Sequence, residues 1–216
     1  MIDVIGNVFG RIMAGCYQVV QDYGLTIIVF TLLSKIIMLP ISIIVQKNSI
    51  KMVKMYPEMN RIKAKYFGSN DLISEENYQL YKRENYHPML DLLPVAIQLI
   101  LLMGVVEGLN KFQIADTVFL GLDLSVIPSK TLGISIIIPV LAALSAWLMC
   151  FVQNKANVLQ SEQSKVNQIT TLLISVGLSL YLGFFVSAGV GLYWIIGNLL
   201  SIVQLFLLNA WINPKK

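Results

Sequence analysis

The sequence predicts an all-α integral membrane protein, with five transmembrane helices around a hydrophilic groove, an N-terminal interfacial helix and a cytoplasmic helical hairpin. The first observation behind this class is composition: 56% of the residues are hydrophobic, only 13% are charged, and the mean hydropathy is +0.70. Soluble domains carry about a quarter charged residues, so this chain could not cover itself with polar surface in water. The other two observations are long apolar stretches and one-sided placement of basic residues. The length of 216 residues suits a single domain, 1–216.

Five apolar stretches are long enough to cross a bilayer, because a spanning helix needs roughly 20 mostly apolar residues. They cover residues 24–45, 89–106, 132–152, 169–187 and 190–211. The second and fourth stretches are near the short limit. We therefore expect helix tilt or local thinning of the bilayer there.

Residues 2–21, ahead of these spans, have the pattern of an amphipathic helix. Apolar residues recur at steps of three and four, namely Ile2, Ile5, Phe9, Ile12, Cys16 and Val19. Polar residues such as Asp3 and Arg11 fall elsewhere on the helical wheel, so we expect this helix to lie in the membrane interface. The segment 13–16 is faintly similar to a lipoprotein cleavage box. No basic region precedes it, and polar residues interrupt the apolar run that a signal peptide needs, which disfavours this alternative.

Lysine and arginine collect on one side of the predicted spans, and in membrane proteins that side is the cytoplasm. The short loops and tail on this side contain Lys47, Lys51, Lys54, Arg61, Lys63, Lys65, Lys82, Arg83, Lys155, Lys165, Lys215 and Lys216. The opposite side has only Arg11, Lys111 and Lys130, balanced by several acidic residues. The pattern predicts an N-terminus outside and a C-terminus in the cytoplasm.

The basic loop over residues 47–86 has the periodicity of a helical hairpin. Its first half carries apolar residues in a three-four spacing typical of helix pairing, namely Met52, Met55, Met59, Ile62 and Tyr66. A turn cluster at 68–71 separates it from a second, polar helix over 74–85. A tethered basic linker is the alternative, but a linker has no reason for this spacing. The methionines form either a packing seam, which we favour, or an adaptable contact surface.

Lys35 lies at the middle of the first span, with apolar-rich sequence on both sides. A lysine there costs roughly 2.5–3.5 kcal/mol on insertion scales, so it is rarely present without a use. We predict a functional role for Lys35. The alternative is a buried structural ion pair with Asp91.

Polar residues recur along one face of other spans as well, although small polar residues also serve ordinary helix packing in membranes. Together with the central cation, these faces predict a wet groove inside the bundle. The residues predicted to line it are Lys35, Thr31, Gln98, Gln153, Trp194 and Asn198.

The sequence contains no pattern that predicts catalysis, a cofactor or a metal site. His87 is the one histidine, and neither cysteine, Cys16 or Cys150, lies near it in sequence. A metal site needs several such ligands to converge. No phosphate-binding loop, nucleophile elbow or acidic pair on one helix face is present. We therefore predict that the protein is not an enzyme.

Short motifs follow one another along nearly the whole chain: 23–28 with 31–35 and Leu39-Pro40, Tyr56-Pro57-Glu58, Lys65-Tyr66, Leu80-Tyr81-Lys82, Pro88, Leu93-Pro94, Ile97-Gln98, 119–124, Ala188-Gly189, Leu192-Tyr193-Trp194 and Asn198. In this order, they resemble the motifs of the YidC/Oxa family of membrane protein insertases. Lys35 stands where the family usually has arginine. Asp91 stands where glycine is usual, and Ile100 and Ser187 stand where proline is frequent.

The resemblance implies an insertase of the bacterial plasma (inner) membrane that uses no nucleotide. Hydrophilic segments of client membrane proteins would enter the cationic groove, and their apolar helices would pass into the lipid bilayer. Met52, Met55 and Met59 on the hairpin would contact clients. The Sec translocon and the ribosome are candidate further partners, and no specific nucleic acid is expected. The alternatives are a small-solute transporter or channel, which would show inverted internal repeats, and a non-inserting structural subunit.

Overall fold

The computed structural model describes residues 2–112, 114, 116–131 and 133–212, and it is almost entirely helical. The elements in chain order are α1 (Ile2–Val20), α2 (Tyr23–Lys65), α3 (Asn70–Arg83), α4 (Pro88–Lys111), β1 (Val118–Phe119), β2 (Leu122–Asp123), the 3₁₀ turn η1 (Ile134–Ile136), α5 (Ile137–Ala156), α6 (Val158–Ser161), α7 (Lys165–Phe185) and α8 (Ala188–Ile212). Five of the described helices, α2, α4, η1 with α5, α7 and α8, are long and apolar enough to cross a membrane. The predicted all-α membrane class is confirmed. Residue 132, where the third span was predicted to begin, lies outside the described residues.

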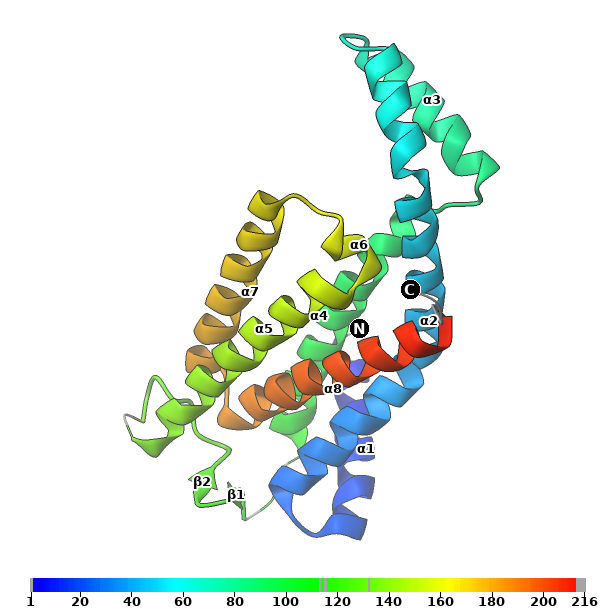
Figure 1. Ribbon diagram of the computed structural model, residues 1–216. Helices are drawn as coiled ribbons and strands as arrows, with labels where there is room; N and C mark the ends of the chain where they lie inside the picture. The colour runs from blue at the N-terminus through cyan, green and yellow to red at the C-terminus, as the bar shows by residue number, and fades with distance from the viewer. Residues whose placement is uncertain (1, 113, 115, 132, 213–216) are drawn as a thin grey trace.

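Helix α2 is a single helix of 43 residues rather than a span followed by a separate hairpin arm. Its first turn is capped by Asp22, whose carboxylate accepts the backbone N–H of Leu25 at 2.8 Å. It continues through Pro40 and Pro57, although a proline removes a helical hydrogen bond. At 1.5 Å per residue it measures about 65 Å, twice the roughly 30 Å of hydrocarbon in a bilayer. About half of α2 therefore projects beyond the bundle, as Figure 1 shows.

The projecting half of α2 and α3 form the predicted hairpin, which has a small core of its own. Met55, Leu80 and Tyr86 are buried at 3%, 2% and 6% exposure. Four partly buried residues pack against them: Met52, Met59, Ile62 and Tyr81. Near the tip, Gly68 has a φ of +89°, a conformation that favours glycine. The hairpin thus has a core made by contacts between its own arms.

The membrane part is a bundle in which α8 lies between α2 and α5, while α7 packs on α5 and α4 packs along α1. Its shared core lies towards the end opposite the hairpin and includes Ile27, Phe30, Val105 and Tyr193. At that end the β1–β2 loop covers the start of α8 (Figure 1). The Ala188 and Gly189 N–H groups donate to the carbonyls of Val126 and Leu124, just after β2, both at 2.8 Å. These bonds satisfy N–H groups that a helix start otherwise leaves unpaired.

The amphipathic helix predicted over residues 2–21 is present as α1, but it is packed on protein along α4. Gly104 of α4 allows this contact, because a Cβ there would come within 2.7 Å of the Phe9 ring. The buried face contains Met13 and Cys16, whereas Ile12 and Val19, which the periodicity placed on that face, are 37% and 84% exposed. Since α1 carries apolar residues on more than one side, its periodicity did not determine which face packs.

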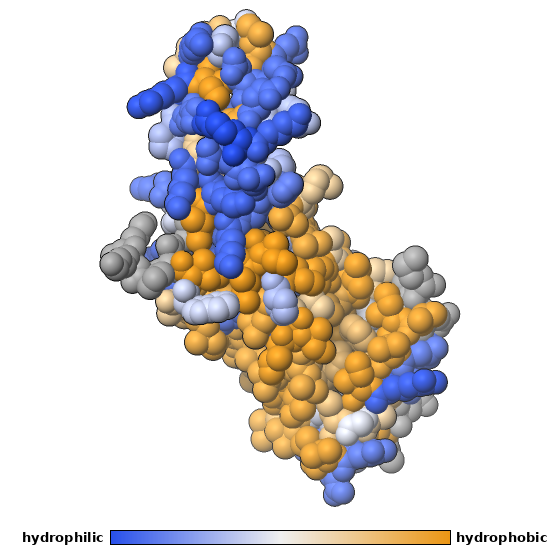
Figure 2. Space-filling view, turned by 90° about the vertical axis from the view of Figure 1, so that its right-hand side faces the viewer, coloured by the Kyte–Doolittle hydropathy of each residue, from blue (hydrophilic) through white to orange (hydrophobic). Residues whose placement is uncertain are grey.

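On the face shown in Figure 2, the surface of the hairpin is mostly hydrophilic and the surface of the bundle is mostly hydrophobic. Large apolar side chains on the bundle helices are exposed, for example Ile37 at 63%, Leu173 at 65% and Leu207 at 63%. Monomeric soluble proteins rarely expose contiguous apolar surface of this extent. The bundle surface is suited to lipid, and the hairpin surface to water.

Candidate functional site

Lys35 lies half-buried on α2, on the side that faces α8. Helical rise places it about 18 Å from the start of α2, near the middle of a hydrocarbon layer of roughly 30 Å. Its ammonium donates a hydrogen bond of 2.6 Å to the Ser201 hydroxyl of α8. None of the ion pairs formed between described residues includes Lys35. A cation is thus held at mid-span by a neutral partner.

Helix α8 also carries polar contacts towards α5 and α7. The Asn198 amide donates to the Ser145 hydroxyl at 2.9 Å, and Ser145 donates to the Ala142 carbonyl at 2.8 Å. The Trp194 indole N–H donates to the Ser179 hydroxyl at 2.9 Å. Trp194 and Asn198, both predicted site residues, therefore lie on the same helix as the partner of Lys35, and each is half-buried.

A second polar junction joins three helices at the end of the bundle nearer the hairpin. The Gln46 amide of α2 donates to the Asn209 side-chain oxygen of α8 at 3.0 Å. The Asn209 amide donates in turn to the carbonyl of Ala156, the last residue of α5, at 2.7 Å. Gln46 and Asn209 were not among the predicted site residues. An asparagine inside a predicted span was the available signal, since polar side chains within membranes are costly and mark contacts or function.

The remaining predicted groove residues are placed differently. Thr31 is fully buried, and its hydroxyl donates to the Ile27 carbonyl of its own helix at 2.6 Å. Gln98 on α4 and Gln153 on α5 are half-buried. The structure thus places Lys35 against α8, the helix that carries Trp194 and Asn198. Thr31 lies instead in the packing between helices. The lining of a groove by these residues stays a prediction.

Asp91 has partners other than Lys35, so the hypothesis of an Asp91–Lys35 ion pair is wrong for this structure. Its carboxylate accepts from the Asn48 amide at 3.0 Å and from the Tyr86 hydroxyl at 2.6 Å. Asn48 lies roughly 20 Å farther along α2 than Lys35. Asp91 is in the first turn of α4, at the hairpin end, and the chain directions of α2 and α4 keep the two charges at different depths.

Asn48 and its partners form a joint where the hairpin meets the bundle. Besides its bond to Asp91, the Asn48 amide donates to the His87 carbonyl and accepts the His87 N–H, each at 3.0 Å. Asn48 is only 3% exposed. Burial, and after it the bond to the Asp91 carboxylate, raises the pKa of the Tyr86 hydroxyl, so it remains a donor at neutral pH. The joint fixes the α3–α4 connection against α2.

Replacing Asn48 with leucine is expected to loosen this joint, because the backbone groups of His87 and the half-buried Asp91 carboxylate lose a partner. Each unsatisfied buried group costs about 1–3 kcal/mol. Hydrogen exchange and limited proteolysis over residues 66–86 should both speed up severalfold. The matched control is Asn60→Leu, the same change at an exposed position of α2. Equal protection in the two variants would show that Asn48 does not secure the connection.

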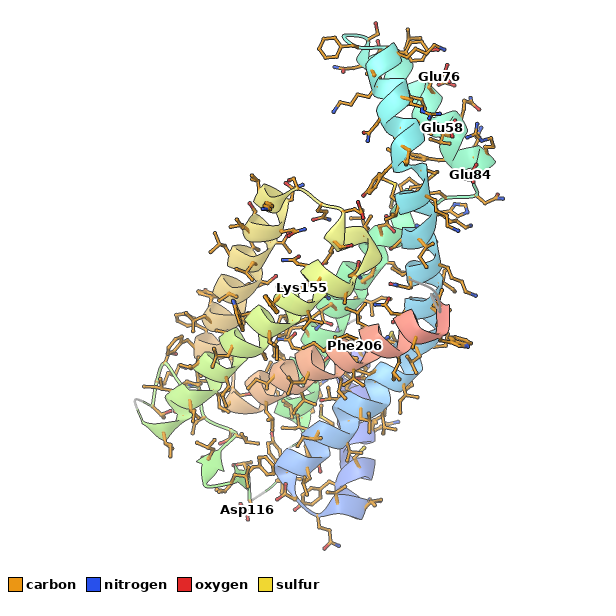
Figure 3. All side chains as sticks on the ribbon, viewed as in Figure 1. Glu58, Glu76, Glu84, Asp116, Lys155 and Phe206 are labelled. Carbon is orange, nitrogen blue, oxygen red and sulfur yellow. The ribbon has the colours of Figure 1, made fainter. Side chains whose placement is uncertain are left out.

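The hairpin methionines are placed mainly inside the hairpin. Met55 is 3% exposed and belongs to its core, whereas Met52 and Met59 are half-buried against it. This arrangement fits the packing seam that the spacing favoured, and client contact through these methionines stays a prediction. A crevice of about 520 Å³ lies beside the seam, lined mostly by charged and polar residues of both arms, among them Glu58, Glu76 and Arg83. Figure 3 labels Glu58 and Glu76 on the two arms.

Metal ligation finds no support in the part of the chain that the structure describes. No group of three or more histidine, cysteine, aspartate or glutamate residues gathers there in a way that could hold a metal ion. Cys16 and Cys150 are both buried and unpaired by disulfide.

The fold and the polar contacts around α8 define a multi-pass helical membrane protein with a cation inside its bundle. A family model described as 60Kd inner membrane protein matches residues 15–216, so the chain belongs to that family, the YidC/Oxa family. The resemblance noted in the sequence is thereby confirmed.

Curated relatives agree with this assignment, and each covers most of the chain. Membrane protein insertase YidC 1 of Streptococcus agalactiae serotype V is 33% identical over 201 residues, which are 91% of this chain and 70% of the relative. Membrane protein insertase YidC 1 of Streptococcus pyogenes serotype M1 is 30% identical over 198 residues, with 89% and 68% covered. Membrane protein insertase YidC of Clostridium perfringens is 30% identical over 205 residues, with 93% and 84% covered. These names favour the insertase hypothesis over a small-solute transporter.

Proposed function

We propose that this protein is a membrane protein insertase that receives a hydrophilic client segment beside Lys35 and releases the client's apolar helix into lipid. The observation that carries the proposal is the Lys35 ammonium, which lies half-buried at mid-span and has a neutral hydroxyl as its partner. Such a cation is costly in hydrocarbon and is expected to have a use. A client carboxylate or polar backbone would supply the missing interactions.

Such a site would lower the free-energy barrier for polar client residues that must cross the hydrocarbon layer. A charged side chain at the centre of a bilayer costs a few kcal/mol on insertion scales. An ammonium and several amide or hydroxyl groups along α8 offset part of that cost. The exposed apolar surface of α7, including Leu173 and Ile174, would let the client's apolar helix remain in contact with lipid. No chemical step and no nucleotide is needed for this cycle.

The orientation that we propose places the hairpin and the C-terminus in the cytoplasm of a bacterial cell and the β1–β2 loop outside. The reason is that short loops rich in lysine and arginine lie on the cytoplasmic side of membrane proteins. The α5–α7 connection lies towards the hairpin end of the bundle, whereas β1 and β2 lie at the opposite end (Figure 1). Asp116 is also at that opposite end (Figure 3). Clients would then reach Lys35 from the hairpin side.

Cysteine labelling tests whether water reaches the proposed client site from the cytoplasm. After replacement of Cys16 and Cys150, single cysteines at Gln98, Gln153 and Asn198 are expected to react with a membrane-impermeant maleimide in inside-out vesicles. A cysteine at Leu173, which is 65% exposed on the lipid side, serves as the unreactive control. Reaction only from the outer face, or none at any of the three positions, would contradict the proposed groove.

Insertion itself is tested in proteoliposomes that contain the purified chain. A single-span client with a polar tail should become protected from added protease, and the protected fraction should rise with the amount of the protein. Liposomes without protein provide the baseline. Equal protection with and without the protein would contradict the insertase proposal.

A further inference from the structure

Two successive hydrogen bonds link the Lys35 ammonium to the backbone of α8. Lys35 donates to the Ser201 hydroxyl oxygen at 2.6 Å, and Ser201 donates its proton to the Gly197 carbonyl at 2.8 Å. A serine hydroxyl has one proton to give and two lone pairs. Because the proton is committed to Gly197, the oxygen that faces Lys35 can only accept. The backbone of α8 therefore fixes the direction of this acceptor.

The ammonium retains unused hydrogen-bonding capacity. It has three N–H donors, and among the described residues Ser201 is its only hydrogen-bond partner. Two donors are thus available to an incoming ligand. In a region of low dielectric, a carboxylate is the acceptor that gains most from them.

The position of this ammonium would be poorly defined without the serine. A lysine has a flexible four-carbon stem, and long charged side chains in membranes extend towards the nearest polar surface. A fixed acceptor on the neighbouring helix selects the rotamers that keep the charge between α2 and α8. We infer that Ser201 is a positioning residue that holds Lys35 for client segments bearing a carboxylate. The inference rests on the proposed insertase function and assigns Ser201 a part in it.

The structure also predicts that loss of the serine hydroxyl leaves the bundle folded. A second hydrogen bond between α2 and α8, from Gln46 to Asn209, lies roughly 16 Å farther along α2. Phe30 of α2 and Tyr193 of α8 remain in ring contact at 6.5 Å between centroids. Gln46→Ala is therefore a matched control: it breaks an α2–α8 hydrogen bond without touching the cation.

The experiment compares two clients that differ only in their translocated tail, one with aspartates and one with asparagines at the same positions. Five full-length variants are reconstituted in proteoliposomes. Three are the single variants Ser201→Ala, Ser201→Thr and Gln46→Ala, and the other two are Lys35→Ala alone and Lys35→Ala combined with Ser201→Ala. Ser201→Ala is expected to slow insertion of the acidic client on the order of tenfold, as loss of a hydrogen bond to a charged group predicts, and the neutral client little. Ser201→Thr should retain the preference. In the Lys35→Ala background, Ser201→Ala should add nothing.

The outcomes distinguish the positioning role of Ser201 from the proposed client site at Lys35. The positioning role is overturned if Ser201→Ala affects both clients equally, as a loss of helix packing would, or if its effect persists without Lys35. In either case a selective defect of Lys35→Ala still supports the client site. If Lys35→Ala slows neither client, the proposed client site fails, and the role of Ser201 fails with it.

Discussion

Replacing residues 53–83 with a short Gly/Ser link is expected to abolish insertion while leaving a folded bundle in the membrane. The hairpin has its own core around Met55 and Leu80, so its removal does not expose the core of the bundle. The link can be short because the Lys51 ammonium donates to the Asn85 carbonyl at 2.8 Å, which shows that the two ends are close. Insertion in proteoliposomes should fall by more than tenfold, and the thermal stability of the bundle should change little.

The expectation rests on the proposed function, under which the hairpin, as the water-exposed part, would be the first to meet a client. Its surface is hydrophilic and basic, and each lysine or arginine near an anionic membrane surface contributes about 1 kcal/mol. It could thus hold a client close to the bilayer before the polar segment reaches Lys35. The Asn48 joint connects the hairpin to the first turn of α4, where Asp91 lies.

Two further variants separate charge from shape in the hairpin. Replacing the exposed Lys54, Arg61, Lys63 and Lys65 with glutamine keeps both arms but removes much of the positive charge. Replacing Phe67, which is 88% exposed near the tip, with serine removes an apolar contact and no charge. A large loss of insertion activity in the glutamine variant and a small loss in the Phe67→Ser variant would assign the role of the hairpin to its positive charge. Full insertion activity of the hairpin replacement itself would show that the hairpin is dispensable.

The sequence was sufficient to predict the class, the five spans and the paired arms of the hairpin, because each of these depends on local periodicity. Apolar runs of about 20 residues leave few alternatives to a membrane helix. The three-four spacing of Met52, Met55 and Met59 likewise predicted a helix-packing seam, and Met55 lies in one. Local pattern did not show that the first span and the first arm are one helix, because the apolar run of the span ends near residue 45 and a polar, basic sequence follows it.

The polar contacts could not be predicted from the sequence, because their partners are far apart in it. Lys35 and Ser201, Gln46 and Asn209, and Asn48 and Asp91 come together only when helices are placed side by side. A helical wheel shows that a side chain shares a face with another, but not which neighbouring helix that face meets. The Asp91–Lys35 hypothesis failed for this reason, because it considered the opposite charges of the two side chains but not the different depths at which they lie in the bundle.

The positive charge of residue 35, which Ser201 holds in place, is expected to determine client preference. Lys35→Arg should keep most insertion activity, because arginine retains the charge and can also donate to Ser201. Lys35→Ala should slow clients with acidic tails on the order of tenfold or more, and Lys35→Glu should slow them further by repulsion. Clients with neutral tails should be affected much less. The measurement is the insertion rate of tail-matched clients in proteoliposomes, with exposed Lys47→Ala on the same helix as the control.

The size of this effect follows from where the charge lies. At mid-span, bulk water and salt ions screen a charge pair far less than at a surface, so a carboxylate a few ångströms from the ammonium is attracted strongly. The same pair on the exposed hairpin would contribute at most about 1 kcal/mol. Raising the salt concentration should therefore weaken the contribution of Lys47 and leave that of Lys35 nearly unchanged. Equal losses for acidic and neutral clients in Lys35→Ala would instead mean that the lysine shapes or hydrates the interior, and no loss for either would make it a structural residue of the α2–α8 contact.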